Sequence, residues 1–254
     1  MVNLKNERGV KMIDLNNKHV IIFGASSGMG QAIAISCLEL GLNVSICARR
    51  LDKLKEISKI SSDKCYACHL DIQHKEKVNK FVLGATQNFG QPDYVVNCVG
   101  VMYYQFMKNA SYDEWLTMVN VNIIGFLNIT QAVLQPIIST KGALINITSD
   151  AGVKPFPGLA VYSGTKAFME FTLKGLRQEL VNSGVRVLNI QPGNVKTSLH
   201  CMSADKEAQQ KYGSDQTENF LNVIDIANAV IYAMGQPKNV SINDLLIEPQ
   251  QEPI

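Results

Sequence analysis

Short apolar runs alternate with amphipathic segments along most of this chain. Residues 19–23 form the first run, and residues 31–40 follow with the spacing of apolar positions expected for one buried helical face. The same alternation repeats to the end of the sequence. It predicts further strands at 43–48, 65–70, 93–97, 142–148, 185–191 and 244–247. It predicts further helices at 51–60, 76–88, 113–135, 162–182 and 225–234.

The predicted strands are apolar at nearly every position, which is typical of a parallel sheet covered by helices on both faces. We therefore predict an α/β, doubly wound fold with seven parallel strands. No linker or shift in composition divides the chain, so residues 1–254 are expected to form one domain. Two regions stand outside the alternation. Residues 1–16 are a polar lead-in, and residues 200–222 have the length of a lid or substrate loop.

Composition and charge are those of a globular chain with a sizeable core, since 46% of its 254 residues are hydrophobic and 18% are charged. The net charge of +2 is too small to favour binding to nucleic acid or to an anionic membrane surface. No run of 18 apolar residues is present, so no membrane span is expected. The N-terminal residues also lack the apolar segment of a secretory signal. We therefore expect a cytoplasmic protein whose six cysteines remain thiols.

One cysteine pattern, Cys65-x-x-Cys68-His69, matches the sequence used for covalent haem attachment and half of a zinc site. Haem attachment of this kind accompanies export, and no export signal is present. A zinc site would need a second pair of ligands, and none follows in the sequence. The segment is therefore predicted to be an ordinary strand, and no metal site is expected.

Three glycines, Gly24, Gly28 and Gly30, lie between the first predicted strand and the first predicted helix. Glycines at this place let the backbone turn tightly and approach a pyrophosphate at the helix N-terminus. Their spacing, G-x-x-x-G-x-G, differs from the commoner G-x-G-x-x-G. The turn therefore predicts a dinucleotide site, although a glycine-rich turn without a ligand has the same sequence.

The second predicted strand ends in a pattern that bears on the choice of dinucleotide. Folds that bind NAD usually place an acidic residue there to accept a hydrogen bond from the ribose 2′-hydroxyl. This chain has Ala48 at that position, followed by Arg49 and Arg50. Because arginine donates two parallel hydrogen bonds to phosphate, we predict NADP(H) rather than NAD(H). The alternative is that the two arginines only begin a solvated helix.

Tyr162 and Lys166 lie four positions apart on a predicted helix, so their side chains share one face. A free phenol has a pKa of about 10, which is too high for a base near neutrality. A cation about 4 Å away favours the phenolate by roughly 4 kcal/mol at an effective dielectric constant of about 20. We therefore predict that Lys166 lowers the pKa of Tyr162. The spacing is common, however, and also describes a packed tyrosine beside a solvated lysine.

Further motifs occur in a fixed order around this pair. They are Asp71-Ile72 after the third strand, Asn97-Cys98-Val99-Gly100 after the fourth, Asn122-x-x-Gly125 in the long helix, Ser149 thirteen positions before Tyr162, and Pro192-Gly193 with Val195 and Thr197 after the sixth strand. Together with the glycine turn they resemble the short-chain dehydrogenase/reductase family, in its one-domain branch. The resemblance extends over about residues 16–249 and implies a Rossmann-type fold.

The resemblance implies reversible hydride transfer between NADP(H) and a carbonyl/alcohol pair. It makes Tyr162 the proton donor and acceptor, with Lys166 lowering its pKa and binding the nicotinamide ribose. Ser149 would orient the substrate oxygen, and Asn122 would hold a water for proton relay. The family also implies a homodimer or homotetramer. The residues expected to bind the cofactor are Gly24, Ser26, Ser27, Gly28, Met29, Gly30, Arg49, Arg50, Asp71, Ile72, Asn97, Gly100, Tyr162, Lys166, Pro192, Gly193, Val195 and Thr197.

Two other functions share this sequence pattern. An epimerase or dehydratase on the same fold would need a larger substrate lobe, and a non-catalytic NADP(H) sensor would tend to lose the tyrosine or the lysine. The substrate is expected to be an uncharged or weakly polar carbonyl compound, and a 3-hydroxy acid is the alternative. The basic side chains in the predicted pocket loops that could recognise a carboxylate are Lys108, Lys154, Lys196, Lys206 and Lys211. Its apolar contacts are expected among Tyr103, Tyr104, Phe106, Phe156, Leu159 and Tyr212.

Overall fold

A seven-stranded parallel sheet forms the centre of the molecule in a computed structural model that describes residues 13–197, 199, 205–212 and 220–252. The strand order is β3-β2-β1-β4-β5-β6-β7, and every neighbouring pair is parallel. This confirms the predicted fold class. The strands are β1 (His19–Phe23), β2 (Asn43–Ala48), β3 (Cys65–His69), β4 (Tyr94–Asn97), β5 (Ala143–Ile147), β6 (Arg186–Pro192) and β7 (Asp244–Ile247).

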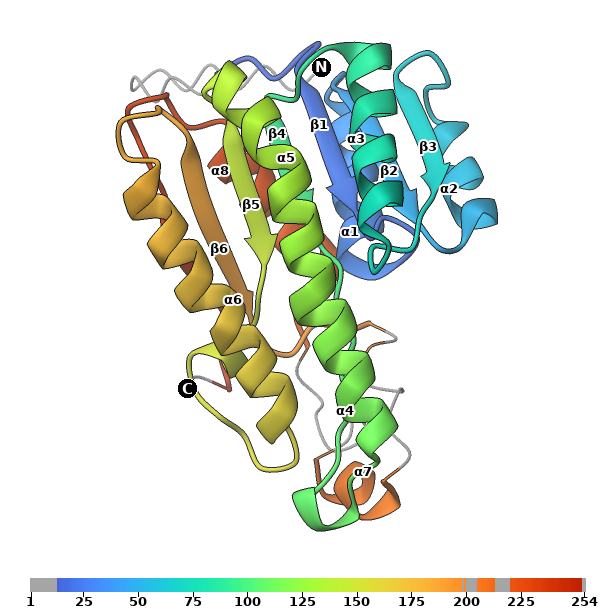
Figure 1. The fold of residues 1–254 in the computed structure, drawn as a ribbon, viewed down its shortest axis with the longest axis vertical. Helices are drawn as coiled ribbons and strands as arrows, with labels where there is room; N and C mark the ends of the chain where they lie inside the picture. The colour runs from blue at the N-terminus through green and yellow to red at the C-terminus, as the bar shows by residue number, and fades with distance from the viewer. Residues whose placement is uncertain (1–12, 198, 200–204, 213–219, 253–254) are drawn as a thin grey trace.

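Helices cover both faces of this sheet (Figure 1). One core cluster packs α1, α2 and α8 against the sheet, and a second packs α3, α5 and α6 against its other face. Buried apolar residues on the strands contribute to both clusters, which explains why the strands lack alternation. The helices are α1 (Gly28–Glu39), α2 (Leu51–Ser58), α3 (Lys75–Phe89), α4 (Tyr112–Met118), α5 (Phe126–Thr140), α6 (Ala160–Glu179), α7 (Lys206–Tyr212) and α8 (Val223–Met234).

The structure has a longer helix than the one predicted at 113–135, and part of it is π-helical. It runs from α4 through a π-helical segment, η2 (Val119–Gly125), into α5. Pro136 lies inside α5, and the helix ends where Lys141 adopts a left-handed conformation with φ of 53°. By length and composition alone Tyr112–Thr140 could cross a membrane. In the molecule it packs on α3 and on β4, as a core helix of the sheet does.

The two regions outside the predicted alternation are partly described. Within the lead-in, the Ile13 backbone N–H donates to the Gly235 carbonyl, and Leu15 is buried in the core. Most of residues 200–222 lie outside the described residues, but α7 falls inside this region and was not predicted.

The carboxyl ends of all seven strands face the same edge of the sheet, because the strands are parallel. In Figure 1 this edge faces α4 and α7. The strand order reverses between β1 and β4, and doubly wound folds bind ligands in the crevice at this reversal. The loops after β1, β2, β4, β5 and β6 therefore meet at one place.

Candidate active site

A cleft of about 650 Å³ lies at this reversal. Its volume falls within the range of about 300–1,000 Å³ that is usual for ligand sites. Most of the residues predicted to bind a cofactor line it. They are Gly24, Ser26, Ser27, Gly28, Met29, Gly30, Arg49, Arg50, Asp71, Ile72, Gly100, Tyr162, Lys166 and Thr197.

The turn between β1 and α1 has a shape that only glycine supports. Gly24 adopts φ of +83°, a conformation that other residues rarely take. A Cβ on Gly30 would lie 2.4 Å from the Gly24 carbonyl oxygen. The backbone therefore closes on itself and presents the N-terminus of α1 to the cleft, as a pyrophosphate site requires.

Arg50 reaches back from the end of β2 to this turn. Its Nη2 lies 2.6 Å from the Ser27 hydroxyl and 3.1 Å from the Ser26 hydroxyl, and its Nε lies 3.3 Å from Ser26. Arg49 also lines the cleft, and both arginines are exposed. A guanidinium and two hydroxyls thus gather beyond Ala48, and together they supply hydrogen-bond donors at this end of the cleft.

Tyr162 and Lys166 lie near the start of α6, at the inner wall of the cleft. Tyr162 is 4% exposed and Lys166 is 3% exposed, which excludes the solvated lysine. Lys166 Nζ donates to the Ile147 carbonyl at 3.2 Å and lies 5.8 Å from the centroid of the Tyr162 ring. The lysine is therefore held between the end of β5 and the phenol.

Burial raises the pKa of Tyr162, and the charges of Asp150 and Tyr104 add to the rise, whereas a hydrogen bond with Ser149 lowers it. Lys166 is not among the causes that set this pKa, so a lowering by Lys166 stays a prediction. Burial lowers the pKa of Lys166 to about 8, although the carboxylate of Glu170 raises it. A half-protonated lysine near pH 8 stabilises a phenolate less than the fully charged cation that the prediction assumed.

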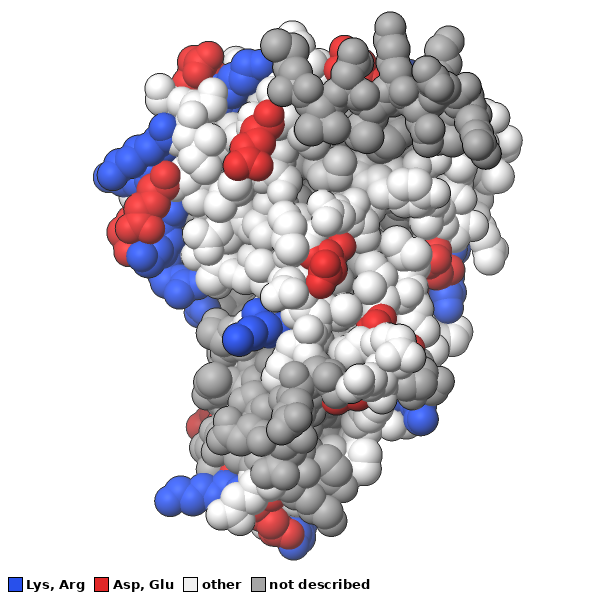
Figure 2. Space-filling model, turned by 180° about the vertical axis from the view of Figure 1, so that it is seen from behind, with Lys and Arg blue, Asp and Glu red and all other residues white. Residues whose placement is uncertain are grey.

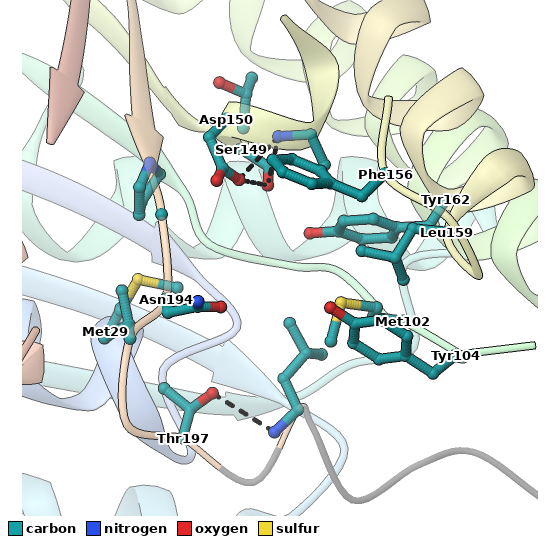
Figure 3. Close-up of a pocket in the computed structure, with 16 residues that line it drawn as sticks. Met29, Met102, Tyr104, Ser149, Asp150, Phe156, Leu159, Tyr162, Asn194 and Thr197 are labelled. Atoms are coloured by element: carbon teal, nitrogen blue, oxygen red, sulfur yellow. Dashed lines mark hydrogen bonds between the residues drawn. The ribbon is translucent and has the colours of Figure 1, made fainter. Parts of the chain in front are cut away.

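Ser149 follows β5 and lies beside Tyr162 on the wall of a second, smaller cavity of about 110 Å³ (Figure 3). Its hydroxyl donates to the Asp150 carboxylate at 2.9 Å and accepts from the Ala151 N–H at 3.2 Å. Tyr162 and Thr197 line both cavities, so the smaller cavity opens beside the cleft. Pro192, Gly193 and Val195, which were predicted to bind the cofactor, line only the smaller cavity.

Asn122 and Asn97 lie behind the cleft and line neither cavity. The Asn122 side-chain oxygen accepts from the Val101 N–H, and its amide nitrogen donates to the Val101 carbonyl, each at 2.9 Å. The same nitrogen donates to the Thr165 hydroxyl at 3.0 Å. Asn122 lies in the π-helical segment η2 and ties the loop after β4 to α6. Asn97 accepts from the Val99 N–H at 3.1 Å, so it holds the shape of the same loop.

A buried row of amides below the cleft was missed by sequence reasoning. Asn97, Asn146 and Asn189 lie in register on β4, β5 and β6. Asn97 donates to Asn146 at 3.3 Å, and Asn189 donates to the Glu170 carboxylate at 2.5 Å. Glu170 is 1% exposed and lies one turn after Lys166 on α6. Its spacing from the lysine is the signal that could have revealed it.

The structure places only some of the predicted substrate contacts at a cavity. Tyr104, Phe156 and Leu159 line the smaller cavity, whereas Tyr103 and Phe106 do not. The side chain of Tyr212 lies outside the described residues. Asp150, which also lines the cavity, was not predicted because no motif of the sequence marks it.

Cys65, Cys68 and His69 lie on β3, as predicted. Within the described part of the chain, no group of three or more His, Cys, Asp or Glu side chains could hold a metal ion.

Comparisons with known proteins extend these observations. The model of the short-chain dehydrogenase family matches residues 18–208. An oxidoreductase from Staphylococcus saprophyticus is 36% identical over 248 residues, which are 95% of this chain and 99% of that protein. Glycine betaine reductase ATRR from Emericella nidulans is 43% identical over 244 residues. That match covers 94% of this chain but only 19% of the fungal protein.

Solved structures give the same result. The closed form of a serine dehydrogenase complexed with NADP+ is 29% identical, has a TM-score of 0.85, and aligns over 93% of this chain and 96% of its own. An alcohol dehydrogenase from Thermococcus sibiricus complexed with 5-hydroxy-NADP is 27% identical with a TM-score of 0.82, covering 93% and 98% of the two chains. These neighbours support a nicotinamide cofactor for this chain. The chain therefore belongs to the short-chain dehydrogenase/reductase family of oxidoreductases, which act on CH–OH and C=O groups.

Proposed function

We propose that the protein reduces a small carbonyl compound with NADPH, or oxidises the corresponding alcohol with NADP+. The observation that carries this proposal is the position of Tyr162 between the two cavities. The larger cleft has the volume and the glycine turn for a dinucleotide, and the smaller one has room for a small substrate. The Tyr162 side chain lines both the cleft and the smaller cavity.

The proposed roles follow from the contacts. Reduction adds a hydride to the carbonyl carbon and a proton to its oxygen, and the cofactor supplies the hydride when bound. Tyr162 would donate the proton, and the Ser149 hydroxyl, turned from the Asp150 carboxylate to which it donates in the structure, would donate to the same oxygen. Lys166 would position the phenol and, when charged, favour its ionised form. Asn122 would support the relay by fixing the loop after β4 against α6.

The ionisation of Tyr162 needs more positive charge than the protein supplies. Its pKa lies above the ordinary value for tyrosine, with burial as the largest cause. The oxidised nicotinamide carries a positive charge, which would favour the phenolate during alcohol oxidation.

The decisive variant is Tyr162→Phe, which removes the hydroxyl and keeps the ring. We expect kcat for carbonyl reduction to fall by about 10²-fold to 10⁴-fold, the usual contribution of a general acid. NADPH binding, measured by the quenching or transfer of fluorescence, is expected to change little. Tyr112→Phe is the matched control, because that tyrosine is 67% exposed on α4. Wild-type turnover in Tyr162→Phe would refute the assignment.

The same experiment separates the rival functions. A sensor would bind NADPH tightly yet reduce none of a panel of aldehydes and ketones, and an epimerase or dehydratase would convert substrate without net consumption of NADPH. The relatives named above act on an alcohol, on serine and on glycine betaine by their names, so they do not agree on one substrate.

Two further proposals concern the molecule as a whole. We propose a homodimer or homotetramer, because large apolar side chains remain exposed along α6 and η2–α5. We also propose a cytoplasmic location. The five cysteines in the described residues are free thiols, which agrees with a reducing compartment.

A further inference from the structure

The smaller cavity has an unbalanced charge. Its described lining contains a single ionisable carboxyl, Asp150, and no lysine or arginine. Lys154 and Lys196 belong to neighbouring segments, but both are exposed and neither lines the cavity. Within the described residues, a substrate in this cavity therefore meets one carboxylate and no basic side chain.

The Asp150 carboxyl is held in a fixed orientation beside the reacting groups. Its Oδ1 accepts from the Ser149 hydroxyl at 2.9 Å and from the Ala151 N–H at 2.7 Å. Its Oδ2 accepts no hydrogen bond from the described residues. Figure 3 shows this carboxyl at the cavity wall, on the same side as Ser149. One oxygen thus anchors the side chain, and the other remains for a ligand.

Other carboxylates strengthen the negative potential at this place. Burial is the main cause that raises the pKa of Asp150, and the charge of Glu248 adds to it. Burial also raises the pKa of Tyr104 to about 12, and the charges of Asp150 and Glu252 contribute. Glu252 itself is fixed by Asn194, which donates to it at 2.6 Å. Besides Asp150, two carboxylates of the segment after β7 therefore act on groups that line the cavity.

Aromatic and thioether side chains form another part of the wall. Phe156 and Tyr104 bring rings to the cavity, and Met29 and Met102 bring thioethers. Ring faces attract a cation, most strongly when water is excluded. A carboxylate with aromatic and thioether neighbours is the set of groups that recognises an ammonium ion, above all a methylated one.

We propose that the substrate carries a small ammonium group, which Asp150 binds with the rings of Phe156 and Tyr104 while Ser149 and Tyr162 hold the carbonyl. This inference rests on the proposed carbonyl reduction. It replaces the expectation of an uncharged substrate, which considered only basic side chains in the loops. Because the Asp150 carboxylate lies 2.9 Å from the Ser149 hydroxyl, we expect the nitrogen to lie within one or two carbons of the carbonyl. The cavity of about 110 Å³ limits the compound to a similar size.

A bound cation would also help the proposed proton transfer. Asp150 is among the groups that raise the pKa of Tyr162. An ammonium group beside this carboxylate would cancel part of its charge, so the phenol would ionise more readily in the presence of substrate. The carboxylate would then disfavour the phenolate mainly when no substrate is bound.

The test compares two aldehydes of the same shape with NADPH: trimethylammonioacetaldehyde, and 3,3-dimethylbutanal, in which carbon replaces the charged nitrogen. Each is reduced by wild type and by Asp150→Asn, which keeps the shape and removes the charge. The variant-to-wild-type ratio of kcat/KM is taken for each aldehyde, since aldehyde hydration in water cancels in this ratio. Asp63→Asn is the control for net charge, because Asp63 precedes β3 at the opposite edge of the sheet.

We expect Asp150→Asn to lose at least about tenfold more activity with the cationic aldehyde than with the neutral one. Phe156→Leu should show the same bias to a smaller degree, because it removes the ring and keeps an apolar side chain. Equal losses for the two aldehydes in both variants would overturn the proposal and make Asp150 a positioning residue for Ser149. Reduction of the neutral aldehyde, or of any other carbonyl, without reduction of the cationic one would overturn it as well. Neither result would contradict the proposed reductase function. That function is contradicted only if no carbonyl compound is reduced.

Discussion

Single residues at the end of β2 set the charge at one end of the cleft. The sequence predicted a basic site from Arg49 and Arg50, because the usual acidic residue is absent at Ala48. The structure shows the groups that Arg50 contacts, because its guanidinium donates to the hydroxyls of Ser26 and Ser27. These contacts join two loops that are distant in sequence, so no pattern within either loop could have shown them.

The paired variant Arg49→Ala with Arg50→Ala is expected to weaken NADPH binding by about 10-fold to 100-fold relative to NADH. Hydrogen bonds to charged groups contribute about 1.5–3 kcal/mol each, and only NADPH has the 2′-phosphate. Titration of both cofactors gives the two Kd values. Lys53→Ala is the control, because Lys53 pairs with Glu56 on α2 and does not line the cleft. If both cofactors weaken equally, the arginines do not select the phosphate.

The pair of Tyr162 and Lys166 shows a limit of reasoning from spacing. The i and i+4 positions correctly placed both residues on one face of α6. The electrostatic consequence stays a prediction, because spacing contains no information on burial. Both side chains lie almost wholly inside the protein, and burial is the largest cause that raises the pKa of Tyr162 and lowers the pKa of Lys166.

At the scale of elements, the alternation of apolar runs was enough to predict every strand. The strands β1, β2 and β7 begin and end where predicted, because glycines and polar residues flank short apolar runs. The π-helical segment η2 was not predicted, since a pattern with 3.6 residues per turn was assumed throughout. The loops of the smaller cavity were not predicted either, because they approach one another only after the sheet has formed.

The turn between β1 and α1 gives a prediction for stability. Gly30→Ala places a methyl group 2.4 Å from a backbone oxygen, so the turn must open. Overpacking of this kind costs about 1–3 kcal/mol, and each kcal/mol lowers the Tm of a domain of this size by about 2–4 °C. We expect a lower Tm in calorimetry and a loss of NADPH binding.

Gly100→Ala provides the comparison for this stability measurement. Its added methyl would lie 3.4 Å from Lys166 Nζ, an ordinary contact distance, so its Tm should remain near that of wild type. A Tm for Gly30→Ala as high as that for Gly100→Ala would show that the turn relaxes without strain.

For the whole molecule, the surface pattern bears on assembly. Figure 2 shows the face opposite to α5 and α6, on which basic and acidic side chains gather along the edge near α2. On the helical layer of α5 and α6, Phe171 is 75% exposed, Ile124 43% and Leu127 39%. Exposed apolar side chains in such a group are typical of a contact between subunits.

Phe171→Asp is expected to convert the proposed oligomer to monomers, because a carboxylate would replace the most exposed large apolar side chain of α6. Light scattering after size-exclusion chromatography measures the mass. Leu40→Asp serves as the control, since Leu40 is 47% exposed at the end of α1 on the other layer. A monomeric wild-type protein would refute the proposed assembly.

The π-helical segment between α4 and α5 also affects how this chain can change in length. Hydrogen bonds there span five residues instead of four, so the segment contains one residue more than a regular helix would need. A deletion of one residue there would restore a regular helix and leave α4 and α5 facing as they do, because the π turn already accommodates the extra residue. The change would fall within the segment itself, which contains Asn122 and its contacts with Val101. The π turn therefore lets the chain carry one residue more at this point without altering how either helix meets its neighbours.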